Sequence, residues 1–346
     1  MKSTVLAFLA AVLNSLGIGE TSGEEIRVGI IGLDTSHVTA FTKVFNDPKA
    51  EGDLAACRVV AAYPEGSPDI ESSTSRVPIY TKDMKAMGIE IVPSIEALLE
   101  KVDAVCLETN DGRPHLAQLL PVLKAKKRVF IDKPIAGSLA DAIAIFEASK
   151  EHGVPVFSSS SLRFSSQNQA VRNGSIGTVT KAHCGSPATI EETHPDLFWY
   201  GIHGVESLFT VMGTGCESVV RTTTPDGRIR VAGTWRGGRT GVFEERKGYG
   251  GTATGDKGDA EVGTYDGYKP LVVEIARYFR TGEVPVSPGE TLEIYAFMEA
   301  ADESKRQGGK RVTLDSVLRK ARALSSLQSS AAPDRSGREP RIAGRP

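Results

Sequence analysis

The sequence predicts an α/β protein, with a doubly wound parallel sheet in its N-terminal half and an open, mainly antiparallel sheet in its C-terminal half. Short apolar runs alternate with amphipathic stretches up to residue 158, and strand-like runs then follow one another through Gly-rich turns. With 346 residues the chain is long enough for about two domains, and its 36 glycines suit many tight connections.

The N-terminal half has the pattern of right-handed βαβ crossovers, because its apolar runs are short and separated by helical stretches. We therefore predict a Rossmann-like domain over residues 24–158. The expected strands are IRVGIIG, CRVVAAY, VDAVCLE, RVFIDKP and VPVFSSS, and the expected helices lie in HVTAFTKVFN, SIEALLEK, HLAQLLPVLKAK and LADAIAIFEASKEHG.

The second domain is expected over residues 159–328. Its strands are TKAHCG, SVVRTTT, RIRVAGTW and TGVFEER, and the short turns between them indicate antiparallel pairing. Two later helices, in PLVVEIARYFRTG and TLEIYAFMEAADESKRQG, are expected to close this domain. Residues 329–346 are rich in Pro, Gly and Arg, so we expect a disordered tail.

The first 23 residues are expected to be a cleaved signal peptide, which predicts an exported protein. The apolar run from Val5 to Leu16 is too short to span a bilayer, and small residues and a polar stretch follow it. A frayed helix on a cytoplasmic protein is the alternative, because a single Lys precedes the run and no A-x-A site follows.

Charge and cysteine usage argue against several classes of protein. The net charge is −2 and no long basic run is present, so a nucleic-acid partner is not expected. Four widely spaced cysteines without a C-x-x-C pair predict neither a zinc nor a redox motif. No H-E-x-x-H pattern occurs, and we expect no metal site and no membrane span.

The stretch RVGIIGLDTSH resembles a nucleotide-binding turn in which two glycines are replaced. Asp34 and His37 stand where the second and third glycines of G-x-G-x-x-G belong. A carboxylate about 4 Å from a phosphate charge would cost about 4 kcal/mol at an effective dielectric near 20. A cofactor therefore requires that Asp34, Thr35 and Ser36 cap the next helix or contact a neutral part of the ligand. Two interpretations stay open: the turn binds a cofactor, or it has lost this function.

Lys133 is the clearest candidate for chemistry in the N-terminal half. It follows the strand RVFI, and ligands bind at the carboxyl ends of the strands in open α/β sheets. Pro134 biases Lys133 away from the helical region, so its amine is expected to point into a cleft. A lysine on the surface is the alternative.

Four segments in order resemble the Gfo/Idh/MocA family of NAD(P)-dependent oxidoreductases over nearly the whole chain after the signal peptide. They are RVGIIGL, PHLAQLLPVLKAKKRVFIDKP, YGIHGVESLFTVMG, and the long segment from YKPLVVEIARYFRTG to GGKRVTL. The resemblance implies NAD or NADP as cofactor and a sugar or cyclitol bound between two domains. It also implies a homo-oligomer formed through the C-terminal sheet.

The resemblance carries two catalytic residues to this chain, Lys133 and His203. An imidazole with a pKa near 6.5 is suited to take a hydroxyl proton at neutral pH, whereas lysine would need its pKa lowered by roughly 3 units, about 4 kcal/mol. We therefore assign proton transfer to His203 and polarisation of the substrate oxygen to Lys133. Packing of His203 against Trp199 and Tyr200 is the structural alternative.

Further contacts are expected around these two residues. Glu206 shares a helix face with His203, and Asp196 is a candidate for the acidic residue that the family places four positions before this histidine, where Trp199 stands here. The substrate contacts are Glu206, Asp196, Trp199 and Tyr200. The cofactor contacts are Gly32, Leu33, Asp34, Thr35, Ser36, His37, Glu65, Thr109, Asn110, Asp111, His115, Asp132 and Lys133.

These residues lead to three hypotheses for function. The first is hydride transfer between a sugar or cyclitol hydroxyl and a nicotinamide. The second is a catalytically idle relative that binds carbohydrate, and the third is a redox-neutral lyase that oxidises its substrate transiently. An exported enzyme would have to hold its cofactor tightly, because free NAD(P) is not expected outside the cytoplasm.

Overall fold

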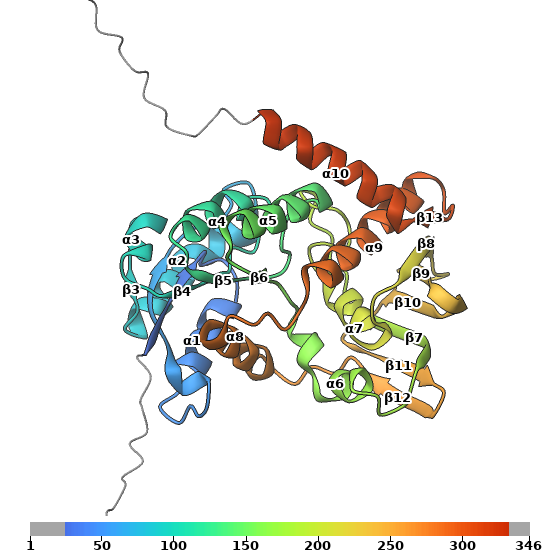
Figure 1. Ribbon diagram of the computed structural model, residues 1–346, viewed down its shortest axis with the longest axis horizontal. Coiled ribbons are helices and arrows are strands. Elements are labelled where there is room, and N and C mark those ends of the chain that lie inside the picture. The colour runs from blue at the N-terminus through green and yellow to red at the C-terminus, as the bar shows by residue number, and fades with distance from the viewer. Residues whose placement is uncertain (1–24, 332–346) are drawn as a thin grey trace, which may run out of the picture.

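The computed structural model describes residues 25–331 and contains two sheets, one in each half of the chain (Figure 1). The predicted signal peptide lies outside the described residues, as does the tail from residue 332. Helix α10 continues to Ala331, which is beyond the expected start of the tail at residue 329.

The N-terminal sheet confirms the doubly wound prediction. Its six strands are parallel and follow the order β3-β2-β1-β4-β5-β6. The strand order therefore reverses at β1, with β2 on one side of it and β4 on the other. The strands are β1 (Ile26–Ile31), β2 (Cys57–Tyr63), β3 (Glu90–Ile91), β4 (Ala104–Leu107), β5 (Arg128–Ile131) and β6 (Val156–Phe157). The helices between them are α1 (His37–Phe45), α2 (Glu71–Ala86), α3 (Ile95–Leu99), α4 (His115–Lys124) and α5 (Leu139–His152).

Helix α2 is missing from the sequence prediction for a physical reason. It contains Pro78 and buries only Ser73 and Met84, so it has no apolar stripe that a helical period would reveal. This helix nevertheless borders the site described below.

The second sheet has seven strands in the order β12-β11-β7-β10-β9-β8-β13. All neighbours are antiparallel except β7 and β10, which confirms a mainly antiparallel sheet. The strands are β7 (Val179–Ser186), β8 (Cys216–Thr223), β9 (Ile229–Trp235), β10 (Thr240–Glu245), β11 (Gly250–Gly255), β12 (Gly258–Val262) and β13 (Val312–Thr313). The helices of this half are α6 (Ser166–Arg172), α7 (Ile202–Met212), α8 (Lys269–Thr281), α9 (Pro288–Arg306) and α10 (Leu314–Ala331).

Helix α8 belongs to the N-terminal core, contrary to the expectation that it closes the second domain. Leu271, Ile275 and Phe279 pack in one apolar cluster with Val28 of β1 and Phe41 of α1. Figure 1 shows α8 beside α1, far from the second sheet. The two lobes in space are therefore not two consecutive pieces of sequence.

Within residues 25–331, no helix combines the length and the apolar composition needed to cross a bilayer. The four cysteines are buried free thiols, as expected of core residues.

Candidate active site

A cleft of about 560 Å³ opens where β1, β4 and β5 end, beside the point at which the strand order reverses. Both halves of the chain contribute to it. Its lining consists of Thr35, Ser36, His37, Ser72, Arg76, Tyr80, Asn110, Lys133, Ser161, Leu162, Thr189, Ile190, Glu191, Trp199, Tyr200, His203, Tyr249, Tyr265 and Tyr268.

Lys133 enters the cleft from the end of β5. Its side chain is buried, and its Nζ donates a hydrogen bond to Oδ1 of Asn110, at 3.3 Å. Asn110 follows β4 and also lines the cleft. The amine therefore faces the cleft, where a ligand oxygen can accept hydrogen bonds from its other N–H groups.

His203 lies across the cleft from Lys133, in the first turn of α7. Its Nδ1 is 2.7 Å from Oγ of Ser160, and its Nε2 has no hydrogen-bond partner in the described part of the chain. Burial, together with the positive charge of Lys133, lowers the pKa of His203 well below the usual value of an imidazole. The ring is therefore neutral at physiological pH and offers a lone pair as a base.

Aromatic side chains form one wall of the cleft. Trp199, Tyr200, Tyr249, Tyr265 and Tyr268 all face it. The hydroxyl groups of Tyr200 and Tyr249 are hydrogen-bonded at 3.0 Å, and the rings of both contact His203 edge-on. Flat rings with polar tips suit a ligand with an apolar face and hydroxyl groups at its rim.

The altered turn keeps its first glycine and turns its carboxylate away from the cleft. Gly32 has a φ of 89°, and a Cβ there would lie 2.4 Å from the Thr109 nitrogen. Asp34 is fully buried and accepts hydrogen bonds from Asn110 N at 2.8 Å and from the Ser73 hydroxyl at 2.7 Å. Burial raises the pKa of Asp34 despite these two donors. Asp34 therefore does not cap α1, which corrects one of the two arrangements expected.

Leu33 and Glu65, two of the expected cofactor contacts, are hydrogen-bonded to each other. The Leu33 amide donates to the Glu65 carbonyl at 2.9 Å, and neither residue lines the cleft. Thr35 and Ser36 do line it, at the N-terminus of α1. Of the expected turn contacts, Thr35, Ser36 and His37 thus remain open to a ligand.

His37 takes the place of the third glycine and forms a buried pair with Asp132. Its Nδ1 is 2.7 Å from Oδ2 of Asp132, a residue that follows β5. The imidazole stacks on Phe41 with ring centroids 5.2 Å apart and meets Tyr268 edge-on at 4.7 Å. Burial acts to raise the pKa of Asp132, but His37 and Lys133 hold it below its ordinary value.

Helix α2 contributes Ser72, Arg76 and Tyr80 to the cleft, near the N-terminus of α1. These three residues are absent from the predicted site because the helix that carries them is not predicted from the sequence. Arg76 is exposed, and a guanidinium beside the amides at a helix N-terminus suits an anionic group.

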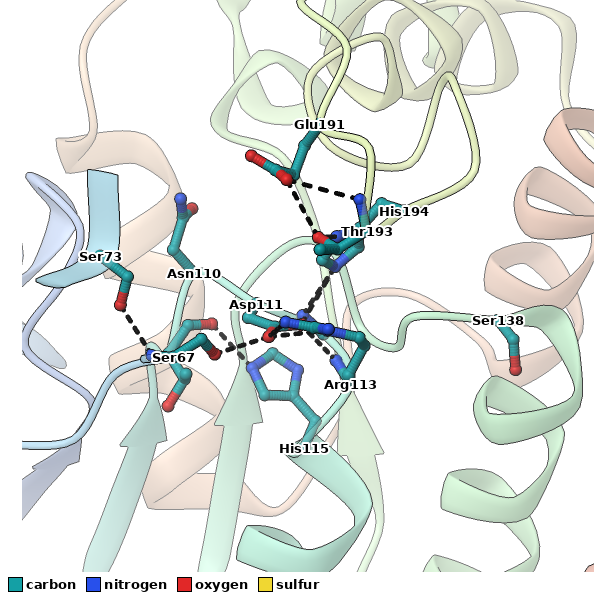
Figure 2. A network of polar contacts seen from close by, with 12 residues as sticks. Ser67, Ser73, Asn110, Asp111, Arg113, His115, Ser138, Glu191, Thr193 and His194 are labelled. Atoms are coloured by element: carbon teal, nitrogen blue, oxygen red, sulfur yellow. Dashed lines mark hydrogen bonds and ion pairs between the residues drawn. The ribbon is translucent and has the colours of Figure 1, made fainter. Parts of the chain in front are cut away.

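Asp111 does not line the cleft but lies in a polar network that joins the two lobes (Figure 2). Its carboxylate accepts hydrogen bonds from Ser67 and Arg113, and it is 3.1 Å from Nε2 of His194. Although burial opposes the effect, His194, Arg113 and Ser67 lower the pKa of Asp111. Asp111 therefore ties the β4 loop to the segment before α7.

His115 and Thr109 have structural contacts instead of facing a ligand. Both ring nitrogens of His115 meet backbone carbonyls, those of Thr109 and Ile135, at 2.8 and 3.1 Å. The Thr109 hydroxyl donates to Gln118 at 3.1 Å. Together they fix the loop from which Asn110 extends.

Two expected substrate contacts lie elsewhere. Glu206 is buried against Arg163 and accepts from the Ser159 hydroxyl at 3.1 Å. Asp196 pairs with Arg221 and with Lys305, the latter at 2.7 Å. Neither borders the cleft, so neither orients His203, and the position of the family's acidic residue is not restored. Trp199 and Tyr200 do line the cleft, as expected. Between residues 25 and 331, no group of three His, Cys, Asp or Glu side chains is arranged to hold a metal ion.

Comparisons with known proteins agree with the resemblance in sequence. Residues 26–160 match the oxidoreductase family with an NAD-binding Rossmann fold, Gfo/Idh/MocA. An inositol 2-dehydrogenase 3 of Saccharopolyspora erythraea is 28% identical over 180 residues, which are 49% of this chain and 47% of that protein. A myo-inositol 2-dehydrogenase of Thermotoga maritima is 35% identical over 116 residues, which are 32% of this chain and 31% of that protein. The chain thus spans less than half the length of either relative.

Solved structures share the fold over most of the chain. A putative myo-inositol dehydrogenase from Sinorhizobium meliloti has a TM-score of 0.65 with 18% identity, covering 84% of this chain and 99% of that one. GenD2 from gentamicin A biosynthesis, solved in complex with NAD, has a TM-score of 0.66 with 16% identity, covering 85% and 98%. At these identities the likeness establishes the two-lobed fold.

Proposed function

We propose that this chain transfers hydride between a sugar or cyclitol hydroxyl and a nicotinamide cofactor, because residues 26–160 match the Gfo/Idh/MocA oxidoreductase family. One observation carries the proposal. Lys133, from the N-terminal lobe, and His203, from the C-terminal lobe, line the same cleft as Thr35 and Ser36 at the nucleotide turn. The amine, the imidazole and the helix N-terminus are the groups that such a reaction requires in one place.

The turn fits a phosphate-bearing cofactor at the N-terminus of α1. Gly32 allows the close approach of the turn to β4, and the charge of Asp34 is satisfied inside the protein. Thr35, Ser36 and Arg76 would hold the pyrophosphate, with Asn110 beside the nicotinamide. A bound nicotinamide supplies the hydride acceptor; the choice between NAD and NADP is left to the test below.

Two side chains of the cleft act on the substrate hydroxyl: one accepts its proton and the other stabilises the negative charge that develops on its oxygen. Nε2 of His203 takes the proton of the substrate hydroxyl, while Ser160 holds Nδ1 and so fixes the ring. Nζ of Lys133 donates a hydrogen bond to the same oxygen, which stabilises its negative charge as the proton leaves. The burial of both groups strengthens these interactions because little water competes.

A polyol substrate is favoured by the aromatic wall and by the relatives. The Tyr200, Tyr249 and Tyr265 side chains offer ring faces and hydroxyl groups together. Two sequence relatives are named as inositol 2-dehydrogenases. We therefore propose a cyclitol such as an inositol as the first substrate to test.

A cofactor-free carbohydrate-binding protein is the second candidate, and one observation favours it. Leu33 N donates a hydrogen bond to the Glu65 carbonyl and neither residue lines the cleft, so two of the expected cofactor contacts do not face it. In this case the cleft would bind a polyol without oxidising it.

Calorimetry with NAD+, NADH, NADP+ and NADPH, followed by turnover of myo-inositol monitored by nicotinamide absorbance, separates the two candidates. We expect one cofactor pair to bind, or to copurify, and His203→Gln to lower kcat by at least about a hundredfold. His183→Gln, a histidine on the second sheet outside the cleft, is the matched control and should leave turnover unchanged. If no nicotinamide binds while myo-inositol does, the oxidoreductase proposal fails and the second candidate stands.

We also propose that the chain is exported and that it associates through the open face of its C-terminal sheet. The first proposal rests on the apolar run from Val5 to Leu16, and the second on the family resemblance. Cell fractionation and light scattering of the purified protein test them. Recovery in the cytoplasm with residues 1–23 attached, or a monomer at all concentrations, would contradict them.

A further inference from the structure

The cleft contains a second imidazole that the proposed reaction does not use. Oxidation of one hydroxyl needs one base, and His203 provides it. His37 lines the same cleft from the other lobe, at a position where the nucleotide turn would ordinarily have glycine. A side chain there replaces a residue whose usual role is close packing of helix on strand, so it calls for a chemical explanation.

The contacts of His37 fix both its orientation and its tautomer. Asp132 lies 2.7 Å from Nδ1 and accepts a hydrogen bond from it, so Nε2 is the ring nitrogen that can exchange a proton with a ligand. Phe41 and Tyr268 hold the ring on two sides. Nε2 has no hydrogen-bond partner anywhere in residues 25–331, and the exposed fraction of the side chain is 8%. A carboxylate that orients an imidazole toward open space is the usual arrangement of a general base.

Lys133 lies next to this pair and completes the chemistry. It follows Asp132 directly in the chain, and its charge acts on both Asp132 and His203. An ammonium group near a base stabilises the oxyanion that forms when a proton leaves a carbon next to a carbonyl group. The cleft therefore holds a base and an oxyanion partner in addition to the base used for the hydroxyl.

We propose that His37, with Asp132 as its positioning residue, removes a proton from a carbon adjacent to the carbonyl group of a bound keto-cyclitol or keto-sugar. Nε2 takes the proton, the electron pair of the C–H bond becomes the C=C bond of an enediolate, and the carbonyl π pair moves to the oxygen. Nζ of Lys133 donates a hydrogen bond to that oxygen. Return of a proton to the carbon restores the ketone, so no oxidant or reductant is consumed. The inference relies on the polyol cleft of the proposed function and not on its hydride step.

The test uses 2-keto-myo-inositol in D2O without nicotinamide, with NMR to follow loss of the C–H signals beside the carbonyl group. We expect the wild-type protein to accelerate exchange above the buffer rate and His37→Gln to lose at least about a hundredfold of this acceleration. Asp132→Asn should lose part of it, and Asp132→Glu should restore part. His183→Gln is the control and should exchange like wild type.

Reduction of the same ketone by NADH and NADPH, measured in parallel, separates this inference from the proposed function. His37→Gln should lower exchange by a larger factor than reduction, and His203→Gln should do the reverse. Exchange without reduction would support the inference and count against the proposed function. Absence of exchange in wild type, an equal loss of both activities in His37→Gln, or loss of exchange in His203→Gln would overturn the inference. Circular dichroism checks that each variant is folded. If His37→Gln does not fold, His203→Gln still decides the test, because its exchange rate should be much less affected than its reduction rate.

Discussion

At the scale of single residues, the site depends on how burial and charge set the protonation of His203. The imidazole is buried, and Lys133 is a positive group that acts on it, so the charged form is disfavoured. The imidazole of His203 is therefore unprotonated at neutral pH and can accept a proton. Its capacity to do so depends on the burial and charge around it, which set its pKa.

We expect NMR titration to show His203 neutral at pH values well below 6.5, the ordinary value of its pKa. Lys133→Met removes a positive charge nearby, so the pKa of His203 should rise. His203 binds a proton less readily in the folded protein than in the unfolded chain, so it lowers the free energy of unfolding as the pH falls below about 6.5. His203→Gln should therefore lose less stability than wild type at pH 5, as measured by urea unfolding. The control is His152→Gln, on α5 away from the cleft. A titration of His203 at or above 6.5 would contradict the expectation.

The location of a side chain can be predicted from the sequence where the end of a strand fixes it. Lys133 and Asn110 follow parallel strands, which end at one edge of the sheet, so their shared location can be predicted from sequence. Helix periodicity gave the face of Glu206 but not its partner, because Arg163 comes from a distant segment. The tyrosines at positions 249, 265 and 268 have no motif, and only the fold brings them to the cleft.

At the scale of elements, a buried ion cluster joins the loop after β6 to helices α6, α7 and α9. The Arg163 guanidinium pairs with Glu206 of α7 and, at 2.7 Å, with Glu290 of α9, which also pairs with Arg172 of α6 at 2.9 Å. Arg163 is 1% exposed. The same helix, α7, carries His203 into the cleft, so this cluster supports the helix that holds the proposed base.

Glu206→Ala should lower the free energy of unfolding by about 3 kcal/mol, because it leaves part of a buried guanidinium without its counter-charge. Urea unfolding followed by circular dichroism measures the change. The double variant Arg163→Met with Glu206→Leu should recover much of the loss, since it removes both charges together. Glu217→Ala, an exposed carboxylate on β8, should change stability by less than about 0.5 kcal/mol. An equal effect of Glu206→Ala and Glu217→Ala would show that the ion cluster does not stabilise the fold.

At the scale of the whole molecule, the chain crosses between lobes more often than its sequence suggests. After the second sheet it returns to the first lobe as α8 and then leaves again as α9, which packs on β8. Periodicity identifies α8 as an amphipathic helix but does not say which sheet its apolar face covers. The boundary at residue 158 therefore describes where the chain leaves the first sheet, not where the first lobe is complete.

Helix α8 supplies a large part of the first lobe's core. Leu271, Val272, Ile275, Tyr278 and Phe279 are at most 2% exposed. The Tyr278 hydroxyl also donates to the Pro155 carbonyl, beside β6. At about 1.5–3 kcal/mol per fully buried side chain, the five contribute more than roughly 7 kcal/mol, comparable to the whole stability of a typical domain.

A fragment of residues 24–158 should therefore fail to fold, although it contains every strand of the parallel sheet. We expect weak circular dichroism and no cooperative urea transition, because the apolar surface that α8 covers would face water. Attaching residues 268–283 through a Gly/Ser linker should restore cooperative unfolding. The matched control carries Ile275→Ser and Phe279→Ser in that attached helix and should behave like the short fragment. Cooperative unfolding of residues 24–158 alone would mean that the first lobe is independent of α8, and the sequence boundary would then also be the structural one.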